Sequence, residues 1–257
     1  MTAMRHDHDG GLAADLPRLI SRRRALTVLT GGAASAVLAA CGRSAEPKPA
    51  TSATGTIPEE TAGPYPGDGS NGPNALATSG VVRSDITKSF GDASGVAEGV
   101  PTTVAMSLTH DGKPLTGAAV YLWHCTRDGQ YSMYDRGVAA ENFLRGVQEA
   151  GDDGKLAFTT IFPGAYAGRW PHIHFEVYEG PDAATTAGTR LHTSQLAIPR
   201  DACKAVYATV GYEQSAQNLN QTSLDRDMVF SDGYDSQLAT TSGDPAGGMT
   251  LTLAVAV

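Results

Sequence analysis

The sequence has few cysteines, fewer basic than acidic residues and no apolar run long enough to span a membrane. Three of its 257 residues are cysteine. The apolar, small-residue stretch at residues 25–40 has 16 residues, whereas a membrane-spanning helix needs about 20. Lys and Arg number 19 against 27 Asp and Glu, a formal net charge of −8. Because nucleic acid requires a basic surface, this balance argues against such a partner and favours a soluble surface.

The N-terminus has the pattern of an export signal. An arginine cluster at residues 22–24 precedes the small-residue stretch, which ends in Leu38-Ala39-Ala40-Cys41. We predict that residues 1–40 form a twin-arginine-type lipoprotein signal peptide and that Cys41 is the lipid-modified first residue of the mature protein. The protein is then exported and anchored to the outer face of the cell membrane, which it contacts only through the lipid. The alternative is an ordinary buried helix, which the arginine cluster and the cysteine disfavour.

Behind this signal the chain divides into a tether and one domain. Residues 41–57 are rich in Ser, Ala, Pro, Thr and Lys, which predicts a flexible tether. Residues 58–257 are enough for one domain with a sizeable core. Two further cysteines, Cys125 and Cys203, form an even pair in an oxidising compartment, which makes a disulfide one interpretation and two buried thiols the other.

Strands dominate the predicted domain, and no internal repeat is visible. Turns rich in Gly, Pro and Asp separate short apolar or alternating segments, a spacing that is typical of an all-β, antiparallel β-sandwich with long irregular loops. Irregular loops are expected at residues 63–99, which would wrap the sandwich, and at 239–248. One helix is predicted at residues 201–210, with Asp201 near its cap. The predicted strands are residues 100–109, 118–125, 155–162, 170–178, 190–198, 227–230 and 249–257.

Two histidines stand two residues apart in one of these strands. Because successive side chains of a strand alternate in direction, His172 and His174 project from the same face. The residues between and after them point the other way, into a core: Ile173, Phe175 and Val177. One interpretation is a pair of metal ligands. The other is a half-exposed face carrying polar residues at alternate positions, which Glu176 and Tyr178 would continue.

Two tyrosines in turns near this strand would complete a four-ligand site. Tyr166 lies just before the histidine strand, and Tyr131 follows the turn of a neighbouring hairpin. Tyr134, three residues on, is an alternative to Tyr131. Imidazole suits zinc, copper, nickel and iron alike, but two phenolates are hard anionic donors that favour a ferric ion.

These residues stand in segments that resemble the metal-binding signature of the intradiol ring-cleavage dioxygenases. That family consists of non-haem Fe(III) enzymes that open catechols between the two hydroxyl-bearing carbons. The resemblance covers about residues 59–195 and implies a β-sandwich with the metal near one side. The matching segments are Gly129-Gln130-Tyr131, Pro163-Gly164-Ala165-Tyr166 and Arg169-Trp170-Pro171-His172-Ile173-His174.

The resemblance also implies a role for each residue of the site. Tyr131 and His172 match the equatorial ligands of Fe(III), and Tyr166 and His174 match the axial pair. Tyr166 would leave the metal and accept a substrate proton. Arg169 would stabilise the negative charge that develops on the substrate, although a surface cation is the simpler interpretation of that residue.

Two further residues match residues that lie near the substrate in this family. Gln195 matches a glutamine close to the substrate oxygens, and its other interpretation is a plain sheet-face residue. Tyr65, in the segment Gly63-Pro64-Tyr65-Pro66, would contact the substrate ring, or else form part of a rigid packing corner.

The sequence therefore predicts an Fe(III) dioxygenase that converts a small aromatic diol and O2 into a muconate-type diacid. Only two residues separate Tyr166 from Arg169, a spacing that resembles the exported, single-domain branch of the family. The alternatives are a non-catalytic cell-surface binding module and a zinc or copper site on the same fold. No oligomeric state is predicted.

Overall fold

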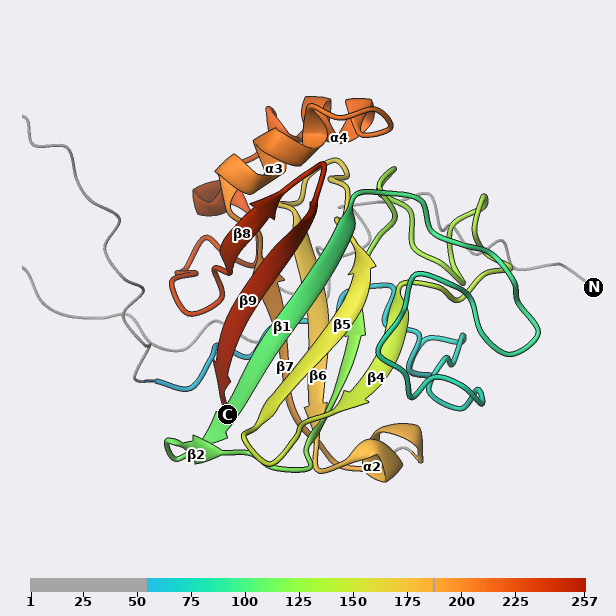
Figure 1. The fold of residues 1–257 in the computed structure, drawn as a ribbon, viewed down its shortest axis with the longest axis vertical. Helices are drawn as coiled ribbons and strands as arrows, with labels where there is room; N and C mark the ends of the chain where they lie inside the picture. The colour runs from blue at the N-terminus through green and yellow to red at the C-terminus, as the bar shows by residue number, and fades with distance from the viewer. Residues whose placement is uncertain (1–54, 187) are drawn as a thin grey trace, which may run out of the picture.

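Two packed β-sheets form the body of the computed structural model, which describes residues 55–186 and 188–257 (Figure 1). One sheet has the strand order β2-β1-β9-β8, with β5 paired to β1 on the edge opposite β9, and the second has the order β4-β3-β6-β7. The first sheet consists of β1 (Pro101–His110), β2 (Lys113–Pro114), β5 (Lys155–Ile161), β8 (Thr240–Asp244) and β9 (Gly248–Ala256). The second consists of β3 (Ala119–Trp123), β4 (Arg145–Glu149), β6 (His172–Tyr178) and β7 (Arg190–Ala197).

The predicted all-β sandwich is confirmed, with one exception to its antiparallel pairing. Strand β9 lies parallel to β1, with Thr102 opposite Met249 and Thr109 opposite Ala256. Every other ladder between named strands is antiparallel in the described part of the chain. The signal peptide, Cys41 and most of the predicted tether lie outside the described residues. Ile57, the last tether residue, is buried in the core, and its N–H donates to the carbonyl of Ala256 at 2.8 Å.

Short helices lie at the ends of the sandwich (Figure 1). They are α2 (Pro181–Thr185), α3 (Arg200–Tyr207), α4 (Glu213–Leu219) and a 3-10 turn at Leu224–Arg226. The predicted helix at residues 201–210 is α3, but Pro199 occupies its N-cap, and no side chain caps it. No helix among residues 55–186 and 188–257 is long and apolar enough to cross a membrane.

Strand β6 is buried on both faces, which rules out a half-exposed polar face. Its inward side chains enter the core between the sheets, as predicted: Ile173, Phe175 and Val177. Its other face lies under a second cluster, to which residues 75–90 contribute Ala75, Leu76, Val81 and Phe90. The predicted wrapping of the sandwich by residues 63–99 therefore creates a sheltered outer face, on which His172 and His174 are each 2% exposed.

Other expectations from the sequence were wrong. Residues 227–230 form no strand, because the Asp227 carboxylate accepts the N–H groups of Val229 and Phe230 and closes a turn. The loop predicted at residues 239–248 contains strand β8, whose residues are all exposed and show no alternation. For Cys125 and Cys203, in contrast, one of the two interpretations is confirmed: both are buried free thiols and form no disulfide, and burial raises the pKa of each.

His124 joins the two sheets and makes stability depend on pH. Its Nε2 lies 2.7 Å from the Thr160 hydroxyl of β5, and burial lowers its pKa to about 4. In the unfolded chain this imidazole takes up a proton below about pH 6.5, so acid favours unfolding between these two values. We expect His124 to lower the free energy of unfolding by about 3 kcal/mol from pH 7 to 4.

Urea unfolding of metal-free protein at several pH values measures this effect. His124→Gln should make the pH dependence less steep, and the buried His172 and His174, whose pKa values are also lowered, should account for part of the remainder. An unaltered slope in His124→Gln would show that His124 is not the group responsible.

Candidate metal centre

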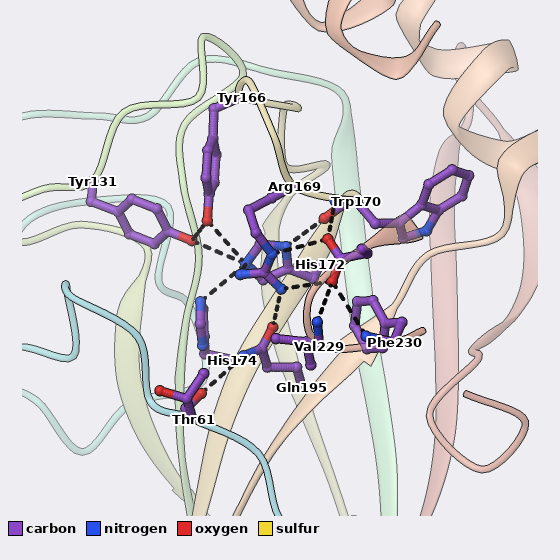
Figure 2. Close-up of polar contacts among 11 residues, drawn as sticks. Thr61, Tyr131, Tyr166, Arg169, Trp170, His172, His174, Gln195, Val229 and Phe230 are labelled. Carbon is purple, nitrogen blue, oxygen red and sulfur yellow. Dashed lines mark hydrogen bonds and ion pairs between the residues drawn. The ribbon is translucent and has the colours of Figure 1, made fainter. Parts of the chain in front are cut away.

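Two tyrosines and two histidines converge on the sheltered outer face of β6 (Figure 2). The His172 Nε2 lies 3.1 Å from the His174 Nε2, 3.3 Å from the Tyr166 hydroxyl and 3.5 Å from the Tyr131 hydroxyl. The two hydroxyls are 3.5 Å apart. The histidines come from one strand, Tyr166 from the segment before it and Tyr131 from the loop after β3. The structure thus brings together all four predicted ligands, which are scattered over 44 positions of the sequence.

These distances fit the donors of a single metal ion. Two donors that are each about 2.0–2.1 Å from one ion stand about 2.9–3.4 Å apart, the edge of an octahedron or tetrahedron. The observed separations of 3.1–3.5 Å are close to that range. Among the described residues, no group of three or more His, Cys, Asp and Glu side chains offers an alternative metal site.

The protonation states of the donors also suit a metal. Burial, reinforced by the charge of Arg169, lowers the pKa of His172 well below its usual value, and burial likewise lowers that of His174. Both imidazoles are therefore neutral, the form that binds metals. The His172 Nδ1 is 2.5 Å from the Trp170 carbonyl, which directs Nε2 toward the tyrosines.

The tyrosines need a cation to ionise. Burial raises the pKa of Tyr131 well above its usual value, so its phenol stays protonated unless a nearby positive charge compensates. A trivalent ion supplies such a charge, as zinc does for a thiolate. With two phenolates and two imidazoles as donors, the residues present fit ferric iron.

Tyr134 is not available as the alternative ligand. Its hydroxyl donates to the Asn71 side chain at 2.7 Å and accepts the Gly67 N–H at 2.8 Å. The Tyr131 hydroxyl, in contrast, contacts both Tyr166 and His172. The structure therefore favours Tyr131 over Tyr134.

Arg169 is a buried cation at the edge of the donor cluster, not a surface residue. It is 3% exposed, and its Nη1 lies 3.4 Å from the His172 Nε2. Burial alone would lower the pKa of its guanidinium, but Tyr166 and Asp227 outweigh that effect and raise it. A fixed positive charge therefore faces the centre.

Gln195 and Asp227 hold this arginine. The Gln195 Oε1 accepts a hydrogen bond from the Arg169 Nη2 at 2.7 Å, and its Nε2 donates to the Thr61 carbonyl at 2.9 Å (Figure 2). The Asp227 Oδ2 accepts from the Arg169 Nε at 3.0 Å. Sequence reasoning had found Gln195 but missed Asp227, which follows Arg169 by 58 positions in a segment without any recognisable motif.

The segment around Tyr65 covers the centre. The Tyr65 ring is tilted against the Tyr131 ring at 4.8 Å between centroids. Gly63 has a φ of +72°, and a Cβ there would lie 3.2 Å from the His174 Cε1. The Trp123 ring stacks in parallel on the His174 ring, with 4.9 Å between the ring centroids. Tyr65 thus adjoins the ligands, as a residue that contacts a bound ring would have to do.

Comparison with known proteins identifies the family. A family model described as "Dioxygenase" matches residues 72–202, half of the chain. A catechol 1,2-dioxygenase of Acinetobacter lwoffii is 46% identical over 57 residues, which are 22% of this chain and 18% of that protein. A 6-chlorohydroxyquinol 1,2-dioxygenase of Cupriavidus pinatubonensis is 32% identical over 105 residues, 34% of this chain and 38% of that protein. The matches span less than half the length of these curated relatives.

A solved structure shows the same fold. The intradiol ring-cleavage dioxygenase from Tetranychus urticae superposes with a TM-score of 0.55 at 24% identity, over 68% of this chain and 86% of that one. The chain belongs to the intradiol ring-cleavage dioxygenase family.

Proposed function

We propose that this protein is a non-haem Fe(III) dioxygenase that cleaves catechol-type rings between the two hydroxylated carbons and yields muconate-type diacids. The observation that carries the proposal is the convergence of two phenol oxygens and two imidazole nitrogens, in which the His172 Nε2 lies 3.1–3.5 Å from the other three donors. Membership of the family supports the identity of the metal and the class of substrate.

Tyr131, Tyr166, His172 and His174 would hold the metal. When bound there, a ferric ion supplies the Lewis acidity that makes a chelated catechol reactive toward O2. The two tyrosines differ in exposure: Tyr131 is 1% exposed, whereas Tyr166 is only partly buried. This difference supports a role for Tyr166 as the ligand on the side from which a diol approaches, with its hydroxyl oxygen taking up a substrate proton.

Arg169 would act on the charge of the bound substrate. Its guanidinium is desolvated, directed at the centre and held by two neighbours, so it needs no reorganisation as negative charge develops on the substrate oxygens. A non-catalytic binding module would have no need for a buried cation beside a complete ligand set. This arrangement favours an enzyme over such a module.

Oxygen uptake by the iron-loaded protein tests the proposal. We expect a coloured protein, because tyrosinate-to-Fe(III) charge transfer absorbs visible light, and we expect stoichiometric O2 consumption with catechol, protocatechuate or hydroxyquinol. Mass spectrometry should detect a diacid that contains both oxygen atoms of 18O2. A zinc-loaded preparation is the matched control, and it should be colourless and consume no O2. An iron-loaded protein that stays colourless and inert toward all three diols would refute the proposal.

A further inference from the structure

Asp227 is a buried carboxylate beside the donor cluster that contacts none of the four predicted ligands in the described structure. It is 0% exposed. Its Oδ2 accepts hydrogen bonds from the Arg169 Nε at 3.0 Å and the Trp170 N–H at 2.6 Å. Its Oδ1 accepts from the Arg169 Nη2 at 3.4 Å and from the N–H groups of Val229 and Phe230. The backbone N–H groups fix the carboxylate, and the carboxylate in turn fixes the arginine.

These contacts determine which part of Arg169 faces the centre. Its Nε and Nη2 are engaged by Asp227, and Nη2 also donates to Gln195. Only Nη1 lies close to the donor cluster, 3.4 Å from the His172 Nε2, and Figure 2 shows the guanidinium between Gln195 and His172. Because guanidinium is planar, holding two of its nitrogens sets the direction of the third.

Charge balance gives a second reason for a carboxylate at this position. A buried guanidinium without a counter-charge would oppose the entry of a trivalent cation a few ångströms away. Asp227 is the only carboxylate that is ion-paired with Arg169 in the part of the chain that the structure describes. The pair is therefore neutral as a whole, but it turns the positively charged Nη1 edge of Arg169 toward the centre and keeps Asp227 on the far side of the guanidinium.

We propose that Asp227 is a positioning residue for the ring-cleavage reaction, which holds the Arg169 guanidinium with Nη1 directed at the substrate oxygens and compensates its charge. This inference rests on the proposed function. The competing interpretation is that Asp227 only closes the turn at residues 227–230. The two interpretations differ in whether loss of Asp227 matters once Arg169 is absent.

A double-mutant cycle on the iron-loaded enzyme separates them. Asp227→Asn should lower kcat about 100-fold with a KM within about threefold, because a small misplacement of a charge-stabilising group costs about that much. Arg169→Gln should lower kcat about 1,000-fold. The double variant should be no slower than Arg169→Gln alone. If the kcat losses of the two single variants multiplied in the double variant, the proposal would be overturned. The matched control is Asp225→Asn, at an exposed neighbouring position, which should leave kcat unchanged.

A second measurement needs neither iron nor activity. In 15N NMR spectra of the metal-free wild type, the Arg169 Nε–H, identified by its absence in Arg169→Gln, should exchange with solvent at least about 100-fold more slowly than exposed arginines. Asp227→Asn should remove that protection. Rapid exchange in the wild type would overturn the proposal even if Asp227→Asn does not fold. A protected Nε–H in a protein that lacks oxygenase activity would instead locate the failure in the proposed function.

Discussion

His172→Ala is expected to abolish iron binding and, with it, activity. The His172 Nε2 is the donor that contacts all three others, at 3.1–3.5 Å from His174, Tyr166 and Tyr131. Alanine removes one of four ligands and leaves a void at the middle of the set, so the remaining donors lose their common centre. Iron content should fall from about one to below about 0.1 per chain, and O2 uptake should fall by more than about 1,000-fold.

Metal analysis after gel filtration, together with the visible spectrum, measures the loss. The matched control is His110→Ala, since His110 lies at the exposed end of β1 far along the sequence from the ligands. That variant should retain its iron, colour and oxygen uptake. If His172→Ala kept stoichiometric iron and full oxygen uptake, the assignment of the ligands would be wrong. Circular dichroism of both variants separates loss of iron from loss of fold.

The convergence of the ligands could be predicted from the sequence because local rules fix most of it. Strand alternation places His172 and His174 on one face whatever surrounds them. Tyr166 is tied to the same strand by a short connection. Only Tyr131 depends on tertiary structure, and its position relies on the resemblance of the motif rather than on any periodicity. Its distinction from Tyr134 became clear only from the hydrogen bonds of Tyr134 to Asn71 and Gly67.

What the sequence could not reveal depends on contacts between distant segments. Asp227 stands in a short apolar run that suggested a strand, and nothing nearby indicates that its carboxylate would reach Arg169. Strand β4 went unpredicted because Arg145 and Gly146, at its start, are atypical strand residues, although both are buried there against other segments. Strand β8 is an exposed edge without alternation, so pairing with β9 alone defines it.

Arg145 is expected to be the largest single contributor to stability among the residues that support the centre. It is 1% exposed, and its four hydrogen bonds go to uncharged oxygens. Two run to Ser132, at 3.1 Å and 3.0 Å, in the loop that carries Tyr131. The other two run to the Pro66 carbonyl, in the segment that carries Tyr65, and to the Tyr121 hydroxyl. One side chain thus fastens both loops over the outer face of the sheet.

Arg145→Met should therefore destabilise the metal-free protein by about 4 kcal/mol. Methionine fills much of the volume but removes all four hydrogen bonds and leaves the Ser132 carbonyl without its donor. A lost hydrogen bond from a charged group costs about 1.5–3 kcal/mol. Urea unfolding gives the free energy. The matched control is Arg136→Met, at an exposed position of the loop that carries Tyr131. It should change the free energy of unfolding by less than about 0.5 kcal/mol.

Arg145→Lys distinguishes the charge of this residue from its shape. Lysine keeps the positive charge but offers a single nitrogen in place of a planar fork, so it cannot reach Ser132 and Pro66 together. We expect Arg145→Lys to lose more than half of the stability that Arg145→Met loses and to bind iron more weakly, because the loop carrying Tyr131 is released. Wild-type stability in Arg145→Lys would mean that charge alone suffices. The segments that carry Tyr65 and Tyr131 would then be held by their own packing, and Tyr131 would keep its position without the hydrogen bonds of the guanidinium.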